Sequence, residues 1–451
     1  MAVNTEVTAE NTEAGLAHRL LKRLIDVQPA EVRALGWSWL YIFAVLSSYY
    51  ILRPIRDDMG VAGGVENLQW LFTGTLLGMI AVNPPFAALV AKLPRIRFIA
   101  FTYRFFGANL LLFILLLHGA SSEQNIWIGR AFFIWASVFN LFVVSVFWAV
   151  MVDVFDTEQS KRLFGFIAAG ATLGGIMGSS LTAAFAKDVP ATYLLLVSVL
   201  LLELAVFSVR RLSRLSDALH RRPAARVDEP PIGGSVLSGV IHAFKSPYLA
   251  NLGVYILLFT ITSTFLYFQQ AEIAKQSFAD RGARTAFFAR VDLWVNVLTL
   301  GAQLFLTGKV LRVIGVGFTL AMLPALSVIG FSGLALAPIM TVLVIYQVLR
   351  RAGNFAFARP TREVLFTVVA REDKYKAKSF IDTVIYRTGD QLGAWAYAGL
   401  GFAGLGMIGI SVVAVPLSLV WLFNSLWLGR TQEKLATAES GRLRAETQAV
   451  L

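Results

Sequence analysis

Twelve long apolar runs constrain the fold of this chain more than any other feature of its sequence. A helix needs roughly 20 apolar residues to cross the hydrocarbon core of a bilayer, and most of the runs are about that long. The runs lie at about 36–54, 66–92, 98–118, 127–152, 162–186, 191–209, 248–271, 285–308, 313–337, 339–358, 378–401 and 404–428. The sequence therefore predicts an all-α, polytopic membrane protein with about 12 transmembrane helices.

The composition agrees with a membrane setting. Of the 451 residues, 57% are hydrophobic and only 15% are charged, whereas soluble domains carry about 25% charged residues. The chain has no cysteine, which excludes disulfides and thiol catalysis. Its four histidines are scattered along the sequence and form no zinc motif, so we expect neither a metal nor any other cofactor.

A basic segment rich in arginine, proline and glycine, at 210–247, divides the runs into two groups of six. Such a composition is typical of a linker. We expect a six-helix bundle at 36–209, a cytoplasmic linker at 210–247 and a second six-helix bundle at 248–428. Residues 1–35 are predicted to be a cytoplasmic segment with a basic amphipathic helix at His18–Val27, and residues 429–451 a charged, helical cytoplasmic tail.

Lysine and arginine are unevenly distributed among the predicted loops. Loops on the side of the N-terminus hold Lys161, Arg162, the linker arginines, Lys376 and Lys378, whereas Lys187 stands alone in an opposite loop. Because cytoplasmic loops carry the excess of positive charge, we expect both termini to be cytoplasmic. We interpret Lys161, Arg162, Lys376 and Lys378 as topology signals or gating ion pairs. The net charge of +12 then indicates contact with membrane lipids and gives no reason to expect nucleic acid as a partner.

A weak internal repeat relates the two groups of runs. Two halves related in this way are typical of the major facilitator architecture, in which the solute site lies between the halves. A shift of 215 residues places Lys161 on Lys376, Gly174 on Gly389, Gly178 on Gly393 and Asp57 on Glu272. We therefore predict two six-helix halves of the major facilitator type.

The first apolar run ends in a charged segment that contains Arg53, Arg56 and Asp57 around Pro54. Ionisable residues in or beside a spanning helix usually face a watery cavity or a partner. Proline removes a backbone donor, so we expect the helix to bend or break there. The alternative is an ordinary helix end whose long side chains reach the membrane surface.

Later runs also carry charged residues among apolar ones. Because arginine binds carboxylates and phosphates with two hydrogen bonds, arginines that converge on a cavity would suit an anionic solute. Asp382, Tyr386 and Asp390 recur every four residues, so they share one helix face and are candidates for contact with the solute. The alternative is that they form a structural network between helices. A carboxylate such as Asp390 or Glu203 would instead suit proton coupling. The predicted substrate-binding residues are Arg53, Arg56, Asp57, Arg290, Asp292, Asn296, Arg350, Arg351, Asp382, Tyr386, Arg387 and Asp390.

Motifs for catalysis are missing from the sequence. It contains no GxxxxGK[ST] phosphate loop, no HExxH metal motif and no GxSxG nucleophile elbow. No nucleophile and base can be paired from sequence either. We therefore predict that the protein is not an enzyme and has no catalytic residues.

Three segments carry a family resemblance. They are ILRPIRDDMGV at 51–61, the stretch from Phe147-Trp148 through Asp156, Lys161, Arg162 and Phe164, and FARPTRE at 357–363, followed by KYKAK at 374–378 and Ile381-Asp382. In this order, which covers most of the chain, they resemble the bacterial and plastid ATP/ADP translocases, a family of nucleotide transporters. The resemblance implies a major-facilitator-like antiporter for nucleotides in a bacterial inner membrane.

The chain departs from that family at several charged positions, and acidic residues of the family's fourth and seventh helices have no clear counterparts around Ala136–Asn140 or Tyr267. Arg56 stands in place of a lysine, which keeps the charge. Asp390, at the end of Arg387-Thr388-Gly389-Asp390, also stands in place of a lysine and reverses the charge. An aspartate repels a triphosphate where a lysine would attract it.

Together these features predict a monomeric secondary transporter that works by alternating access and exchanges an anionic, nucleotide-like solute. The first alternative is a proton-coupled facilitator or exporter of another small metabolite or drug, with Asp390 or Asp57 carrying the proton. The second alternative is a lipid-handling or structural membrane protein that keeps the fold without transporting a solute.

Overall fold

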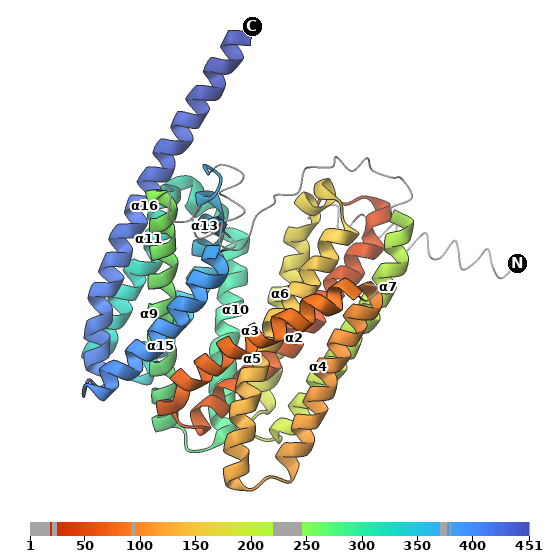
Figure 1. The fold of residues 1–451 in the computed structure, drawn as a ribbon, viewed down its shortest axis with the longest axis vertical. Coiled ribbons are helices and arrows are strands. Elements are labelled where there is room, and N and C mark those ends of the chain that lie inside the picture. The colour runs from red at the N-terminus through yellow and green to blue at the C-terminus, as the bar shows by residue number, and fades with distance from the viewer. Residues whose placement is uncertain are drawn as a thin grey trace, which may run out of the picture. The chain divides into compact units, whose positions relative to one another are not determined.

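Helices make up the described part of the protein (Figure 1), and no strand occurs there. The structure is a computed structural model that describes Arg19 and residues 25–92, 95–219, 246–369, 377–378 and 380–450. The elements up to residue 219 are η1 (Pro29–Glu31), α2 (Val32–Ala62), η2 (Val65–Asn67), α3 (Leu68–Lys92), α4 (Arg95–His118), α5 (Ser122–Val154), α6 (Thr157–Phe185) and α7 (Ala191–Leu219). From residue 247 on they are α9 (Pro247–Ser277), α10 (Arg281–Phe305), α11 (Thr307–Leu336), α12 (Met340–Gly353), η3 (Asn354–Ala358), α13 (Arg359–Leu365), η4 (Ile381–Ile385), α15 (Tyr386–Phe402) and α16 (Met407–Val450).

Eight of the described helices are long and apolar enough to cross a membrane. These stretches are Pro29–Ala62, Phe98–His118, Ser122–Val154, Arg162–Phe185, Ala191–Leu215, Pro247–Ser277, Thr307–Leu336 and Met407–Ala438. Each predicted apolar run coincides with helical structure, and π-helical turns at η3 and η4 interrupt the tenth and begin the eleventh. The prediction of an all-α, polytopic membrane fold is confirmed, and the number of twelve crossings stays a prediction.

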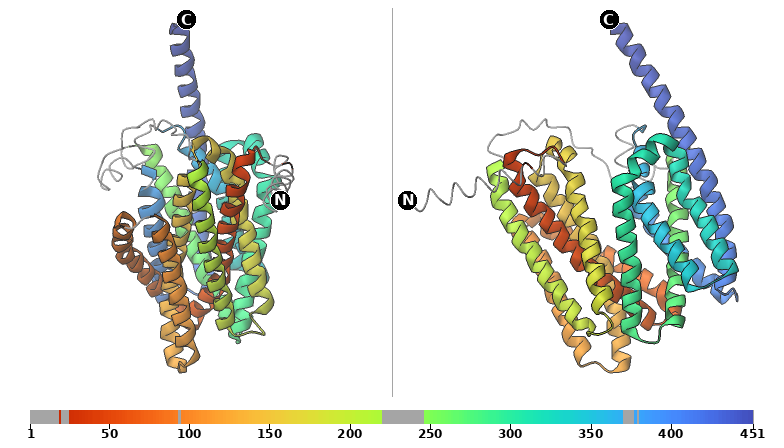
Figure 2. Two further views of the ribbon diagram at one scale, coloured as in Figure 1. Left: turned by 90° about the vertical axis from the view of Figure 1, so that its right-hand side faces the viewer. Right: turned by 180° about the vertical axis from the view of Figure 1, so that it is seen from behind.

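Several helix boundaries differ from those of the apolar runs. Of the two expectations for Pro54, a bend or a break, the break is wrong, because α2 continues through Pro54 to Ala62, and the bend stays a prediction. Helix α7 continues to Leu219, and α16 continues to Val450 and projects beyond its neighbour α11 (Figures 1 and 2). Arginine, lysine and glutamate favour helices as strongly as leucine does, so a helix does not end where hydropathy falls. Most of the predicted helix His18–Val27, and the linker residues 220–245, lie outside the described residues.

The chain forms two compact units, each of which includes a segment from the other half of the sequence. Unit 1 comprises residues 1–59, 77–228 and 280–293. Unit 2 comprises residues 60–76, 229–279 and 294–451. The first half of α10 therefore packs with α2 in unit 1, and the start of α3 packs with α9 and α15 in unit 2.

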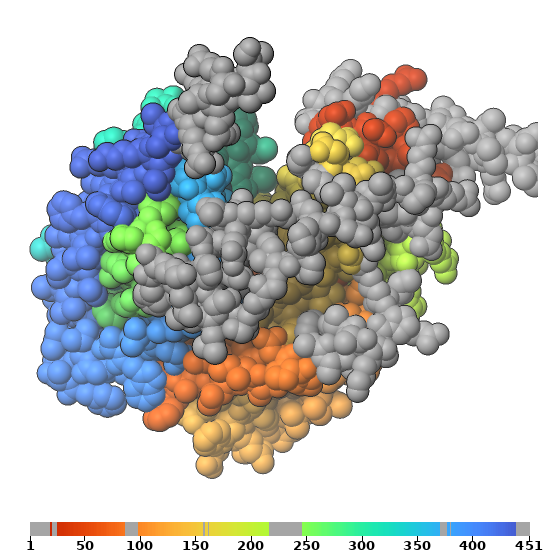
Figure 3. All heavy atoms as spheres, turned by 45° about the horizontal axis from the view of Figure 1, so that its top comes forward, coloured from red at the N-terminus to blue at the C-terminus, as the bar shows by residue number. Residues whose placement is uncertain are grey.

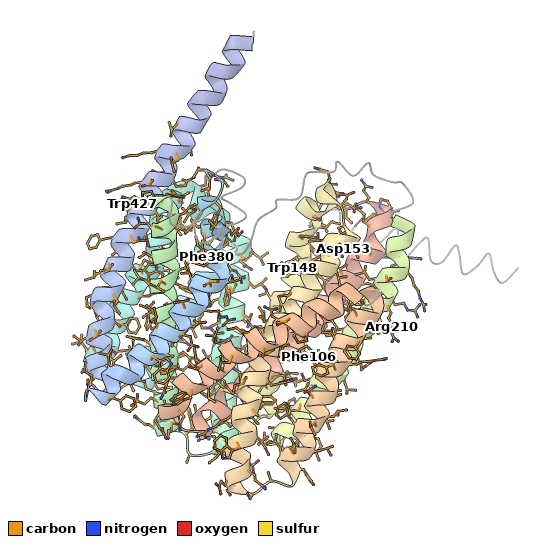
Figure 4. All side chains as sticks on the ribbon, in the orientation of Figure 1. Phe106, Trp148, Asp153, Arg210, Phe380 and Trp427 are labelled. Carbon is orange, nitrogen blue, oxygen red and sulfur yellow. The ribbon has the colours of Figure 1, made fainter. Side chains whose placement is uncertain are left out.

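Unit 1 has an aromatic core between α2, α4 and α5. The hydroxyl of Tyr41 on α2 is 2.6 Å from that of Tyr103 on α4, and Tyr103 donates to the Val143 carbonyl of α5 at 2.9 Å. Phe106, labelled in Figure 4, packs edge-on against Phe139 of α5 with ring centroids 5.2 Å apart. These buried contacts hold α2 in place and so position its charged end.

Glycines four residues apart bring helices together in both units. A Cβ at any of these glycines would collide with the neighbouring helix, so only glycine permits the observed approach. The contacts are Gly174 with Phe43 and Gly178 with Ser47 in unit 1, and Gly389 with Thr260 and Gly393 with Ile261 in unit 2. The weak sequence repeat thus corresponds to a repeated helix contact, between α6 and α2 and between α15 and α9. Figure 3 shows α9 in green beside the blue C-terminal helices.

Candidate functional site

The charged end of α2 is buried in unit 1. Asp57 and Asp58 are 5% and 2% exposed, and the side chains of Arg53 and Arg56 are 18% and 14% exposed. Arg56 donates to Asp57 Oδ1 from Nε at 3.0 Å and from Nη2 at 2.6 Å. Its guanidinium also lies 5.1 Å from the centroid of the Phe133 ring. These charges are therefore enclosed by protein and do not form a solvated helix end.

Arg53 contacts a carboxylate from the second half of the sequence. Its Nη1 lies 3.4 Å from Oδ1 of Asp292 on α10, which is 2% exposed. The Nε donor of Arg53 has no hydrogen-bond partner. Two of the residues predicted from sequence are thus brought together, and the guanidinium keeps one buried donor without a hydrogen-bond partner.

A second ion cluster on α10 involves residues that were not predicted from sequence. Asp58 accepts hydrogen bonds from Arg281 Nε at 3.0 Å and from Arg284 Nε at 2.8 Å. The two arginines are three residues apart and so share a helix face. Between them, a Cβ on Gly282 would lie 2.5 Å from the Ala186 carbonyl oxygen. The sequence signal for this cluster was the Arg-x-x-Arg spacing of Arg281 and Arg284 just before an apolar run. Their carboxylate partner, Asp58, lies far away in sequence, so the ion pairs could not be predicted.

A cavity of about 460 Å³ adjoins this cluster within unit 1. It is lined by Asp58 and Met59 from α2, by Lys187 and Asp188 from the connection between α6 and α7, and by Arg281, among others. Charges of both signs therefore surround the place where α10 is anchored to α2.

In unit 2, Arg350 of α12 is 3% exposed. It donates to Ser327 Oγ at 3.2 Å, Ser263 Oγ at 2.7 Å, Thr262 Oγ1 at 2.9 Å and the Phe259 carbonyl at 3.1 Å. In this conformation the guanidinium is thus held by hydroxyls and a carbonyl, and it ties α12 to α9 and α11.

A second group of charged residues in unit 2 lies around the π-helical turns. Arg362 Nη2 of α13 is 3.3 Å from Asp382 Oδ1 of η4. Lys378 forms an ion pair with Glu363 of α13. Because π-helical turns occur frequently at functional sites, this is a suitable place for residues that bind a solute.

Helix α15 carries an ion pair within its first turn. Arg387 Nη1 donates to Asp390 Oδ2 at 3.2 Å, three residues further along the helix. Tyr386 lies with its ring 6.2 Å from the ring of Phe259, and the Arg350 guanidinium lies 5.2 Å from that same ring. Helices α9, α12 and α15 therefore meet at Phe259, which brings Arg350 and Tyr386 to one aromatic side chain.

The remaining predicted residues are distributed over α6, α10 and α12. Arg290 is exposed on α10, Asn296 is buried further along it, and Arg351 is half-buried on α12. Arg162 forms an ion pair with Glu31 of η1 at 2.9 Å. Lys161 lies in α6, and Lys376 is outside the described residues.

The arrangement suits ions more than covalent chemistry. Partly buried arginines on α2 and a more exposed one on α15 can attract an anion, and the carboxylates beside them can carry a proton or balance charge. Within the described residues, no three histidine, aspartate or glutamate side chains are placed to hold a metal ion.

Comparison with known proteins relates the chain to transporters. No family model matches it. It is 20% identical to ADP,ATP carrier protein 2 of Chlamydia pneumoniae over 468 residues, which cover 87% of this chain and 86% of that protein. It is 21% identical to ADP,ATP carrier protein 1 of Chlamydia muridarum (strain MoPn / Nigg) over 312 residues, 61% of this chain and 59% of that protein.

A solved structure shares the fold. It is a bacterial homolog of the human lysosomal transporter Spinster in an inward-facing, unoccupied conformation. The TM-score is 0.57 and the sequence identity is 12%, and the match covers 91% of this chain and 99% of that chain. The resemblance to the ADP,ATP carrier proteins is weak but consistent, and it confirms the family likeness inferred from the motifs. The chain is a multi-pass membrane transporter, and the proteins that it resembles are transporters and not enzymes.

Proposed function

We propose that this distant relative of the ADP,ATP carrier proteins exchanges an anionic, nucleotide-like solute across a bacterial inner membrane by alternating access. The observation that carries the proposal is the buried end of α2, where Arg53 and Arg56 lie within a membrane-spanning helix. Each guanidinium is paired with a carboxylate, Arg53 with Asp292 and Arg56 with Asp57, and charged residues inside a membrane-spanning helix commonly mark the pathway of a solute or ion.

Two groups of residues are proposed to contact the solute. Arg53, Arg56 and Asp57 on α2, with Asp292 on α10, form one set of solute contacts. Asp382, Tyr386, Arg387 and Asp390, with Arg290, Asn296 and Arg351, remain candidates for the other. Arg350 fits a supporting role in the present conformation, since its donors are directed at α9 and α11.

Alternating access also needs contacts that form and break. The ion pairs of Asp58 on α2 with Arg281 and Arg284 on α10 suit this purpose, because conformational transitions commonly break one set of ion pairs and form another. Arg162 with Glu31, and Lys378 with Glu363, are further pairs of this kind.

The orientation follows from the distribution of positive charge. The described end of α7 carries Arg210, Arg211 and Arg214, whereas the connection between α6 and α7 carries Lys187 alone. By the positive-inside tendency, the end of α7, the linker and both termini face the cytoplasm.

A proton-coupled facilitator is the second candidate, and the Asp390 side chain favours it. This carboxylate is 16% exposed within an apolar helix and has one arginine, Arg387, as its partner. A carboxylate so placed is a common carrier of a coupling proton in membrane transporters.

A thermal-shift screen of the purified protein separates the candidates by ligand class. A solute that binds only the folded state raises the melting temperature. We expect nucleoside mono-, di- or triphosphates to raise it, and uncharged nucleosides to raise it less. Stabilisation by an uncharged metabolite or organic cation alone would contradict an anion exchanger and favour the second candidate.

A further inference from the structure

An exposed ion pair on the outside of unit 1 has no part in the function proposed above. Arg104 of α4 donates from Nε to Glu203 Oε1 and from Nη2 to Glu203 Oε2, both at 3.1 Å. Glu203 lies on α7, which packs along α4 (Figure 1). The two side chains are 51% and 49% exposed, so the pair faces outward and not into the bundle.

The depth of this pair makes it unusual. Arg104 is six residues into the spanning stretch Phe98–His118, and Glu203 is twelve residues from either end of Ala191–Leu215. At about 1.5 Å per residue, Arg104 lies about 9 Å inside its stretch and Glu203 about 18 Å inside its own. A lone arginine at such a depth would extend toward the headgroups, but this guanidinium is held by Glu203. Charged side chains in the hydrocarbon normally face protein or water, not lipid.

The pair lies in the middle of an apolar surface. Exposed side chains recur every three or four residues along both helices, as expected for one face of each helix. We define the α4–α7 face as Phe101, Arg104 and Phe105 of α4 with Leu200, Glu203 and Phe207 of α7. Polar side chains at the centre of an apolar membrane surface can bond across a contact with another helix, so the pair marks a place where a further helix can pack.

We propose that the α4–α7 face binds the same face of a second copy of this chain. The argument is charge complementarity. Because Arg104 and Glu203 pair with each other, their charged groups lie at one depth, and a two-fold axis along the membrane normal would place each guanidinium opposite the carboxylate of the other copy. Each carboxylate then meets two guanidinium groups, and all four charges leave the lipid.

Other occupants match this face less well. Lipid tails offer neither donor nor acceptor to the exposed half of the pair. A partner with one charge would satisfy one side chain and repel the other. A second copy satisfies both, so the protein associates laterally in the membrane and is not the monomer expected from sequence.

Two charge-reversal variants test the interface. Arg104→Glu makes the face acidic and Glu203→Arg makes it basic, so each variant repels its own copies while the two attract each other. Two-colour single-molecule counting of the full-length chain in supported bilayers measures the fraction of dimers. We expect the unaltered chain to be dimeric, each variant alone to lose at least tenfold in dimer fraction, and the coexpressed pair to recover it as heterodimers. The proposal is wrong if the unaltered chain is monomeric, or if coexpression gives no more dimers than either variant alone.

Cysteine cross-linking gives an independent test that leaves the ion pair intact. Because the chain has no cysteine, a single introduced thiol can form a disulfide only between copies. Leu200→Cys lies on the α4–α7 face, and the matched control Val313→Cys lies on α11, where the side chain is 80% exposed. With copper phenanthroline and oxygen as the oxidant, we expect a cross-linked dimer for Leu200→Cys and none for Val313→Cys. Equal cross-linking of the two variants, or none for Leu200→Cys, contradicts the interface.

Discussion

The contact between Asp58 and the start of α10 allows a quantitative prediction. Asp58 is 2% exposed and Arg284 is 7% exposed, so their hydrogen bond at 2.8 Å is fully buried. Removing one partner of a buried ion pair costs about 3–5 kcal/mol. The Arg281 side chain is 47% exposed, so its bond to Asp58 adds at most about 1 kcal/mol.

The variant Asp58→Asn keeps one acceptor oxygen, so we take the lower end of this range. It should lower the free energy needed to open α10 locally from α2 by about 3 kcal/mol. Since about 1.4 kcal/mol is a factor of ten, the open population should rise about 100-fold. Met59 adjoins the contact and is 2% exposed. In the cysteine-free chain, Met59→Cys therefore reports opening through its rate of labelling by a maleimide.

We expect Asp58→Asn to raise the labelling rate of Met59→Cys about 100-fold. The matched control is Glu66→Gln, which removes a carboxylate that is 71% exposed and lies 3.5 Å from Lys275. That control should change the rate less than twofold, because exposed ion pairs contribute little. A change of less than threefold for Asp58→Asn would refute the claim that this carboxylate anchors α10.

Three further predictions concern packing, the solute site and coupling. Gly174→Val places a side chain against the Phe43 backbone, so it should lower stability by about 1–3 kcal/mol in a melting assay, whereas Gly165→Val, with no atom near its Cβ, should not. Arg387→Glu places two acids together, so it should raise the KM for exchange at least tenfold. The control Arg312→Glu, at an exposed position of α11, should leave the KM unchanged. If the two variants have equal KM values, Arg387 is not part of the site. Asp390→Asn should abolish uptake driven by a proton gradient if the second candidate function is correct; if the first is correct, it should change the KM for nucleotide exchange without abolishing exchange, as measured in proteoliposomes.

The membrane fold could be predicted because hydropathy is a local property of the sequence. Each apolar run coincides with a helix, but helix ends could not be predicted, since charged residues such as Arg210 continue α7 beyond its run. Sequence left open whether α2 bends or breaks at Pro54, and it does not break because the packing of a helix in its bundle can outweigh one lost backbone bond.

The candidate site was accessible from sequence only in part. The pair of Arg387 and Asp390 follows from helix spacing alone, and the structure contains it. The pairing of Arg53 with Asp292 needs the packing of α2 on α10, which no local pattern encodes. Glu203 was considered for proton coupling, but its partner Arg104 is on α4 and the pair faces outward, which only the packing of α4 on α7 reveals.

Counterflow in proteoliposomes tests the central claim most directly. Vesicles are loaded with an unlabelled nucleotide and diluted into a trace of labelled nucleotide, with no pH gradient. We expect them to accumulate label transiently. Because Arg56 is proposed to bind the anion, Arg56→Gln should reduce the initial rate of accumulation at least tenfold. Accumulation only when a proton gradient is imposed, or equal rates for the variant and the unaltered chain, would contradict exchange of an anion through the buried arginines of α2.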